Sequence, residues 1–383
     1  MDNSATTAPG AAAKQAMLQA MECYGNPSSL HKAGLEAEHM VRTARQQVLS
    51  ALGVRNHAGE VFFTASGTEA NNLAILGSVY AKERRVGNRI VTTEGEHSSV
   101  EMVLRELEKK GFEIVRIPTV QGVLDMEFAQ KEINRDTLLV SAMMVNNETG
   151  ALYDLKSLFA LTRRNAPDAI THCDAVQGFM KTIFSPAAIG ADLLTISSHK
   201  IHGPKGVGAL YVSAEILKAK KLIPITLGGG QESGMRSGTE NTIGIAGFGA
   251  ACAAAQATLR TDLAYMTKLR AYLEERLVRN GEIVLNVPRG NRAPHIVNLT
   301  LPNIKSETML HYLSGRDIYV SSGSACSSHG HATSRALAGF GLTPALADCS
   351  LRISLCPANT QEELDALCDA LFSGINELVR IHK

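Results

Sequence analysis

The sequence lacks tryptophan, any Cys-x-x-Cys pair and an excess of charge of either sign. Its 38 lysines and arginines oppose 37 aspartates and glutamates, which argues against a basic nucleic-acid-binding surface and against an acidic tail. An odd number of cysteines, seven in 383 residues, argues against a disulfide framework. We therefore expect a protein of a reducing compartment, the cytoplasm, with no direct nucleic-acid binding.

Long uninterrupted apolar runs are absent as well. Glycine or a charged residue breaks the apolar stretches before the roughly 20 residues that a membrane helix needs. The chain is polar from Asp2 onward, unlike a signal peptide. With 45% hydrophobic and 20% charged residues, the composition is that of a globular protein and excludes collagen and coiled coils. We expect no association with a membrane.

What the sequence does contain is an alternation of short apolar runs and helical patterns. Strands are expected at residues 61–64, 89–93, 112–117, 138–145, 169–173, 193–197 and 206–212. Helical patterns lie between several of these runs, for example at residues 35–52 and 100–110. Such alternation is typical of βαβ units, so the fold class is α/β with a mostly parallel sheet flanked by helices.

The pattern changes after a long helical stretch at residues 241–279. Strands are expected at residues 296–301, 318–320 and 351–355, followed by a final helix with a capping box of Thr360 and Glu363. This part predicts a second, smaller α+β unit. The first 30 residues, rich in glycine, proline, serine and alanine, are expected to form a loop.

Lys200 and Asp174 both follow apolar runs of the expected sheet. A lysine after a strand and before a Gly-Pro turn can form a Schiff base with a carbonyl cofactor, although an exposed lysine is the simpler interpretation of the residue alone. Asp174 could keep a pyridine nitrogen protonated, or it could cap a helix. Gln177 follows Asp174 at helical spacing and could donate to a ring oxygen.

Further polar clusters follow other strands of the expected sheet. Ser66 to Glu69 could hold a phosphate at a helix N-terminus, and His97 could stack on a flat ring. Asn146 to Gly150 form a third cluster. Each has an ordinary turn or a structural histidine as its alternative, but all lie at the carboxyl ends of successive strands, where α/β proteins bind ligands.

Cys326 lies in a loop of small residues, Ser321 to His331. Such a loop favours an accessible thiol, whose thiolate is a good nucleophile, and His329 could lower its pKa when protonated. A zinc site of Cys326, His329 and His331 is the alternative, but no fourth ligand is evident, so we expect no metal.

Arg352 lies within the expected strand at residues 351–355, where a guanidinium needs an anion. It could hold a substrate carboxylate in a bidentate manner or form a structural ion pair. A long polar loop rich in glycine and serine, Gly228 to Thr239, is of the length that is usually functional.

Together these motifs resemble the cysteine desulfurases of the NifS/IscS type, which are class V aminotransferases of fold type I. The resemblance covers nearly the whole chain. Its most specific stretches are Ser197 to Gly206, Met235 to Thr239 and Ser321 to Cys326. It implies a large pyridoxal-phosphate-binding domain with a sheet of the seven-stranded type and a small domain that carries the cysteine loop. We accordingly expect residues 1–15 to belong to the small domain, 16–255 to form the large domain and 256–383 to form the small one.

The resemblance also implies a role for each matching residue. Lys200 would bind pyridoxal 5'-phosphate, His97 would stack on its ring and take part in catalysis, and Cys326 would accept the sulfur of L-cysteine as a persulfide. The residues that would contact the cofactor ring are Asp174, Gln177 and Asn147. Those that would contact its phosphate are Gly67, Thr68, Ser197, His199 and, from the neighbouring subunit of a homodimer, Thr239. Those that would bind the substrate carboxylate are Arg352, Asn3 and Asn147.

The implied function is conversion of L-cysteine to L-alanine, with sulfur passed to an acceptor protein, either an iron–sulfur scaffold or a tRNA-thiolation protein. A selenocysteine lyase or another class V aminotransferase is the alternative within the family. A non-catalytic sulfur carrier and a zinc-binding module are alternatives from other classes. Lys200, Asp174 and Cys326 together favour the enzyme.

Overall fold

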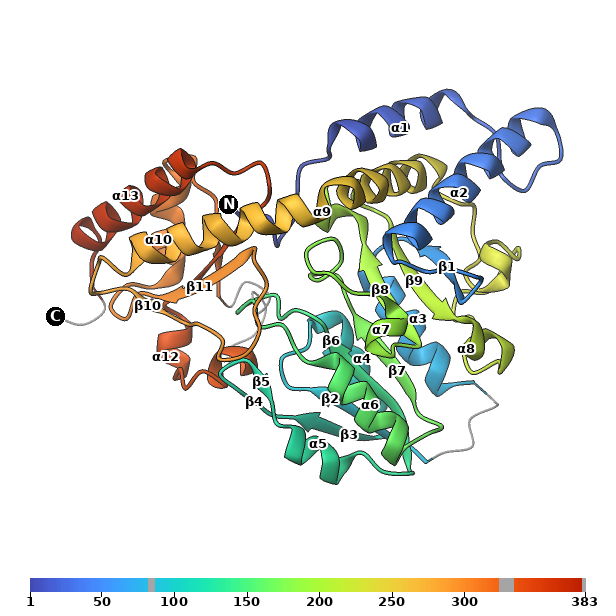
Figure 1. Cartoon of the computed structure of the whole chain (residues 1–383), viewed down its shortest axis with the longest axis horizontal. Helices are drawn as coiled ribbons and strands as arrows, with labels where there is room; N and C mark the ends of the chain where they lie inside the picture. The colour runs from blue at the N-terminus through green and yellow to red at the C-terminus, as the bar shows by residue number, and fades with distance from the viewer. Residues whose placement is uncertain (82–86, 324–333, 381–383) are drawn as a thin grey trace.

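The computed structural model describes residues 1–81, 87–323 and 334–380. Its centre is a seven-stranded sheet (Figure 1). In spatial order the strands are β1 (Gly59–Thr64), β9 (Gly208–Ser213), β8 (Leu193–Ser197), β7 (Ile170–Asp174), β6 (Thr137–Met143), β2 (Arg89–Thr93) and β3 (Glu113–Ile117). Only β9 runs antiparallel to its neighbours. The predicted α/β class and mostly parallel sheet are therefore confirmed.

The strands of this sheet are apolar on both faces because helices cover both. Neighbouring residues of one strand belong to different cores: Phe62 to the core that includes residues of α3 and α4, and Phe63 to the core that includes residues of α2, α6 and α9. This double burial explains the continuous apolar runs. The helices of this unit are α2 (Lys32–Ala51), α3 (Gly67–Val79), α4 (Ser98–Lys109), α5 (Met126–Glu132), α6 (Leu155–Asn165), α7 (Pro186–Ile189) and α8 (Ala214–Lys218).

The smaller unit is a four-stranded antiparallel sheet with its own core. Its strands are β10 (Val284–Leu285), β11 (Ile296–Thr300), β13 (Ser350–Ser354) and β12 (Ser321–Ser322), and its helices are α10 (Ser306–Ser314), α11 (Arg335–Ala338), α12 (Pro344–Ala347) and α13 (Gln361–Glu377). The predicted capping box of α13 is present. The remaining short elements are β4 (Thr119–Val120), β5 (Val123–Leu124) and the 3-10 turns η1 (Ser198–Lys200) and η2 (Glu232–Gly234).

Two local predictions are wrong. Within the first 30 residues, expected to be a loop, Ala11–Glu22 form helix α1, which packs on α9 through Ala13 and Ala20 (Figure 1). Its small buried side chains permit close packing, so tertiary contact outweighs the weak helical pattern. Residues 318–320 are not a strand; β12 starts at Ser321 and pairs with β13.

The long helix α9 (Thr242–Leu277) joins the two units (Figure 1). By length and composition α9 could cross a membrane, contrary to the expectation that no stretch has these properties. However, Ile245, Phe248 and Cys252 are buried against α1, α2 and the large sheet, as in the core helix of a soluble protein.

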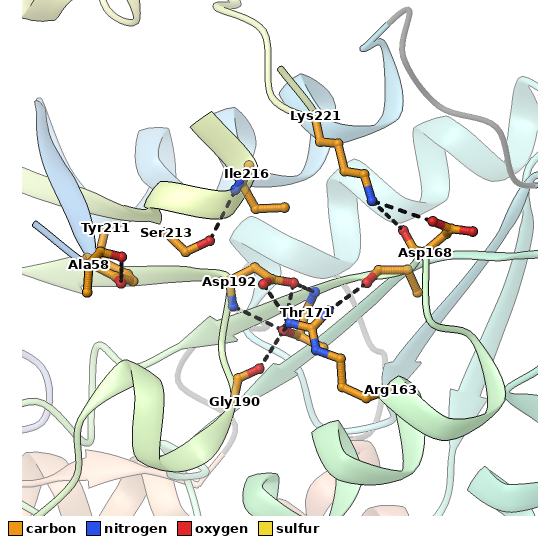
Figure 2. A network of polar contacts seen from close by, with 11 residues as sticks. Ala58, Arg163, Asp168, Thr171, Gly190, Asp192, Tyr211, Ser213, Ile216 and Lys221 are labelled. Atoms are coloured by element: carbon orange, nitrogen blue, oxygen red, sulfur yellow. Dashed lines mark hydrogen bonds and ion pairs between the residues drawn. The ribbon is translucent and has the colours of Figure 1, made fainter. Parts of the chain in front are cut away.

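A polar network ties β7 to β8 near their amino ends (Figure 2). Asp192 is buried; its Oδ2 accepts the backbone N–H of Thr171 at 2.9 Å and its Oδ1 accepts Arg163 Nη2 at 2.5 Å. The ion pair of Lys221 and Asp168, nearby in the same view, is 3.8 Å long, and its Asp168 side chain is 70% exposed.

We expect Asp192→Ala to lower the free energy of unfolding by about 3 kcal/mol, because it leaves the buried N–H of Thr171 without its acceptor and removes the carboxylate that pairs with Arg163. Asp168→Ala should cost less than about 1 kcal/mol, because exposed ion pairs contribute little. Urea unfolding at one fixed protein concentration checks both values. Equal losses for the two variants would contradict the prediction.

Candidate active site

The loops that follow β1, β2, β6, β7 and β8 surround a cavity of about 360 Å³ at one edge of the large sheet. The carboxyl ends of parallel strands meet at one edge, so the polar clusters predicted from separate parts of the sequence come together here. Of the residues expected to form the site, the following line the cavity: Gly67, Thr68, His97, Asn147, Asp174, Gln177, Ser197, His199, Lys200 and Arg352.

Asp174 ends β7 with its side chain buried at the cavity. Its Oδ1 accepts the backbone N–H of Val176 at 3.0 Å, and its Oδ2 accepts Asn71 Nδ2 at 2.8 Å. Both carboxyl oxygens thus accept a hydrogen bond within the wall of the cavity. A buried carboxyl group at this place fits a ligand with a protonated ring nitrogen.

Lys200 follows β8 at the end of η1. Its Nζ donates to the backbone carbonyls of Ser4 at 2.5 Å and Ala5 at 2.8 Å. The N-terminal segment thus holds the amine at the cavity, which both carbonyl-bearing residues also line. A side-chain amine in this position fits the aldehyde of pyridoxal phosphate.

The N-terminus of α3 forms another wall of the cavity. Ser66 caps the helix by accepting the backbone N–H of Glu69, and a Cβ on Gly67 would lie only 3.0 Å from Val176 Cγ2, so glycine keeps this approach open. Backbone N–H groups at a helix N-terminus, together with Ser197, suit a phosphate. The donors and the buried carboxyl group of this cavity therefore fit pyridoxal phosphate.

His199 lies beside the same wall, with its Nδ1 3.2 Å from Thr6 Oγ1. Burial lowers its pKa to about 4, and the charges of Lys200, Lys181 and Lys205 act in the same direction. In the protein without ligand this histidine is therefore neutral at neutral pH. Its expected contact with phosphate is a hydrogen bond unless the phosphate itself raises this pKa.

Of the two roles that the sequence left open for Arg352, the structure shows the structural ion pair. Arg352 forms an ion pair with Asp2, Nη2 to Oδ1 at 3.1 Å, and also donates to Ser321 Oγ at 2.8 Å and to the backbone carbonyl of Asn147 at 2.9 Å. Its Nε is buried and has no hydrogen-bond partner among the described residues. The guanidinium is thus anchored structurally, and its contact with a substrate carboxylate stays a prediction.

Three of the expected site residues lie away from the cavity or outside the described residues. The Nδ2 of Asn3 donates to the backbone carbonyl of Ser354 at 3.0 Å, and Asn3 is not part of the cavity wall. Thr239 is exposed at the end of its loop, so its contact with a neighbouring subunit stays a prediction. Cys326 falls in residues 324–333, outside the part of the chain that the structure describes.

The two ends of the segment that contains Cys326 are nevertheless anchored at the cavity. Before it, Gly323 donates its N–H to Ser350 O at 2.7 Å, next to the cavity residue Ser321. After it, Ser334 donates to the carboxylate of Glu148, the neighbour of Asn147. The alternative zinc ligands, His329 and His331, also lie outside the described residues, and the described part of the chain holds no metal-binding cluster.

Sequence reasoning missed three residues at the cavity: Asn71 and Ser99, which line it, and Glu96, which is not part of its wall. Asn71 lies inside α3, where a polar residue usually indicates a solvated face, yet it is 1% exposed. Ser99 lies in the first turn of α4 and Glu96 precedes His97. The strongest available signal was their position within the polar clusters that follow β1 and β2.

Glu96 fixes the turn that carries His97. Its Oε1 accepts Thr93 Oγ1 at 2.6 Å and the backbone N–H of Met143 at 2.8 Å, whereas its Oε2 is buried without a partner among the described residues. Burial, with a smaller contribution from the charge of Asp174, raises the pKa of this carboxyl to about 8. The folded protein therefore keeps a proton on Glu96 at neutral pH.

This raised pKa makes folding pH-dependent. The folded state retains a proton on Glu96 that the unfolded state loses near pH 4.5. The contribution of Glu96 to the free energy of unfolding is therefore full below pH 4.5 and is lost as the pH rises towards 8. Glu96→Gln removes this dependence while keeping the acceptor. We expect the free energy of unfolding of Glu96→Gln, relative to the natural protein, to rise by about 1.4 kcal/mol per pH unit between pH 5 and 7. Urea unfolding at both pH values checks it; a constant difference would contradict it.

Comparison with known proteins adds independent information. The family model described as "Aminotransferase class-V" matches residues 1–367. The chain is 37% identical over 359 residues to "Cysteine desulfurase IscS" of Dictyoglomus turgidum, covering 93% of this chain and 89% of that protein. It is also 37% identical to the "NifS/IcsS protein homolog" of Lactobacillus delbrueckii subsp. bulgaricus, covering 98% of each chain.

Solved structures agree with the sequence relatives. A structure titled "NIFS-LIKE PROTEIN" is 34% identical, has a TM-score of 0.90 and covers 98% of this chain and 99% of its own. Another, titled "SspA in complex with cysteine", is 28% identical with a TM-score of 0.79 and covers 94% of this chain and 99% of its own. The chain therefore belongs to the class V aminotransferase family and, within it, to the group of the NifS/IscS cysteine desulfurases.

Proposed function

We propose that this protein is a pyridoxal-phosphate-dependent cysteine desulfurase that converts L-cysteine to L-alanine and transfers the sulfur to Cys326. The observation that carries the proposal is one cavity that joins Lys200, Asp174 and Arg352, with both ends of the Cys326 segment anchored beside it. Relatives named as cysteine desulfurases, and a structural neighbour titled as a complex with cysteine, support the same substrate.

Each wall of the cavity would hold one part of the cofactor. Lys200 would bind the aldehyde, Asp174 the ring nitrogen, and the N-terminus of α3 with Ser197 and His199 the phosphate. Gln177, whose Nε2 donates to the backbone carbonyl of Ser4 at 2.9 Å, has a second amide hydrogen for the ring oxygen. When bound, the cofactor supplies an electron sink that stabilises negative charge on the carbon skeleton of the substrate.

The substrate is held and attacked by groups of the chain. The Nε of Arg352 would bind the carboxylate of cysteine. The thiolate of Cys326 would form a bond with the substrate sulfur while the carbon–sulfur bond breaks and a proton takes the place of sulfur on carbon. The products are L-alanine and a persulfide on Cys326, from which a thiol reductant releases sulfide.

The proposal includes a homodimer and a protein acceptor of the persulfide. Large apolar side chains are exposed on α1 and the segment after it, among them Leu18, Met21, Tyr24 and Leu30, and a second subunit would cover them. Thr239 would then reach the neighbouring phosphate site. The acceptor would be an iron–sulfur scaffold or a tRNA-thiolation protein. A cytoplasmic location suits the six described cysteines, which are all unpaired.

The purified protein loaded with pyridoxal phosphate should release alanine and sulfide in equal amounts from L-cysteine and dithiothreitol. Quantifying both products over one time course is the test. Turnover of selenocysteine but not of cysteine would replace the proposal by selenocysteine lyase activity. Conversion of an added 2-oxo acid into an amino acid, without sulfide, would replace it by amino-group transfer.

A further inference from the structure

Asn71 connects the carboxylate of Asp174 to the start of α4. Its Nδ2 donates two hydrogen bonds, to Asp174 Oδ2 at 2.8 Å and to Ser99 Oγ at 2.8 Å. A carboxylate only accepts hydrogen bonds, so Asp174 determines which end of the amide faces it. In that orientation Asn71 Oδ1 is buried without a partner among the described residues. Such an unpaired buried acceptor is unfavourable, and the two donated hydrogen bonds must offset its cost.

Ser99 connects Asn71 to His97 through hydrogen bonds. Its Oγ lies 2.8 Å from His97 Nδ1, and its backbone N–H donates to the same nitrogen at 3.1 Å. Because a backbone N–H can only donate, Nδ1 is an acceptor and carries no proton. Ser99 Oγ already accepts from Asn71, so its own hydrogen is available for Nδ1 as well.

The electrostatic surroundings of His97 act in the same direction. Burial lowers its pKa, and the charge of Lys200 lowers it further, whereas Asp174 opposes the shift. The ring is therefore neutral, and a neutral ring with an unprotonated Nδ1 has its hydrogen on Nε2. This hydrogen is the ring's one polar hydrogen for the cavity that His97 lines.

We propose that Asn71 and Ser99 are positioning residues that connect Asp174 to His97 and hold the His97 ring in the tautomer with its hydrogen on Nε2. The tautomer follows from the hydrogen bonds alone; its catalytic consequence rests on the proposed function. His97 then meets the substrate as a fixed hydrogen-bond donor, and the amide of Asn71 also orients Asp174, the expected partner of the cofactor ring nitrogen.

The direct test is nuclear magnetic resonance of the protein labelled with ¹⁵N-histidine, with and without pyridoxal phosphate. The resonances of His97 are those that disappear in His97→Gln. In the natural protein we expect one tautomer, with Nε2 protonated, from pH 6 to 8. In Ser99→Ala and Asn71→Leu the ¹⁵N chemical shifts of the two His97 ring nitrogens should move towards the average of the two tautomers. Ser99→Thr keeps the hydroxyl and should restore the natural shifts.

Two neighbours serve as matched controls. Ser98 is exposed on the same turn of α4, and Asn72 Nδ2 bonds only the backbone carbonyl of Thr68 among the described residues. Ser98→Ala and Asn72→Leu should leave the His97 resonances unchanged. A hydrogen on Nδ1 in the natural protein, or unchanged shifts in both Ser99→Ala and Asn71→Leu, would overturn the proposal.

Kinetics separates this proposal from the proposed function. We expect Ser99→Ala to lower kcat for alanine formation by roughly tenfold with little change in KM for cysteine, and Ser99→Thr to restore it. If the natural protein forms no alanine but shows the expected tautomer, the proposed function fails and the positioning role of Asn71 and Ser99 stands. If it forms alanine but His97 carries its hydrogen on Nδ1, only the positioning role fails.

Discussion

Lys200→Ala is expected to lower the rate of alanine formation from L-cysteine by roughly 10⁴-fold or more, because no other group can replace an amine that binds the cofactor covalently. The structure supports this role through position: Lys200 Nζ is held at the cavity by the carbonyls of Ser4 and Ala5, in a wall shared with Asp174. Product assays measure the loss of alanine formation, and the visible absorbance of the bound cofactor measures the loss of covalent binding.

Lys200→Arg separates covalent binding from charge. The guanidinium keeps the positive charge and can still bond the two carbonyls, but it does not bind an aldehyde as the amine does. We expect Lys200→Arg to be as inactive as Lys200→Ala. After borohydride reduction of the natural protein, mass spectrometry should find the cofactor on the peptide that contains Lys200. Substantial activity of the arginine variant would exclude the covalent role.

Cys326→Ser is expected to lower sulfide release from L-cysteine by roughly 10³-fold or more while leaving cofactor binding intact. No described cysteine can take its place. Burial raises the pKa of the thiols of Cys173 and Cys252, and that of Cys368 to about 11, so they stay protonated and unreactive. The described thiol that is not fully buried, Cys23, belongs to the end of α1.

Cys23→Ser is therefore the matched control and should retain sulfide release within about twofold. Unfolding midpoints of both variants show whether either change acts through stability. Sulfide release from Cys326→Ser at a rate close to that of the natural protein would mean that sulfur leaves without a persulfide on this residue. The cavity residues, and not the 324–333 segment, would then carry the whole reaction.

Much of the fold and of the site could be predicted from local sequence. The strands of the large sheet are continuous apolar runs because both faces are buried, and this pattern is visible without any structure. Lys200, Asp174, His97 and the start of α3 follow such runs, and the geometry of a parallel sheet then brings them together. Helix α1 was missed because alanine-rich segments with little apolar contrast become helical mainly through packing.

Other features depend on contacts between distant parts of the chain. From the sequence, Arg352 could be either a substrate ligand or a structural cation. The structure places Asp2, 350 residues away, at its guanidinium. Asn71 looks like a solvated helix residue until α3 places it against Asp174, 103 residues away. Glu96 becomes a buried acid only because the end of β6 closes over it.

The sequence by itself determined the α/β architecture, the family and most of the polar groups that line the cavity, because these depend on short-range patterns and on strand ends. Only the tertiary structure decided how those groups are oriented and protonated: which nitrogen of His97 carries the hydrogen, which donor Arg352 keeps and how Asp174 is held. Hydrogen-bond direction and burial depend on packing between elements, and packing is not encoded in the spacing of residues along one segment.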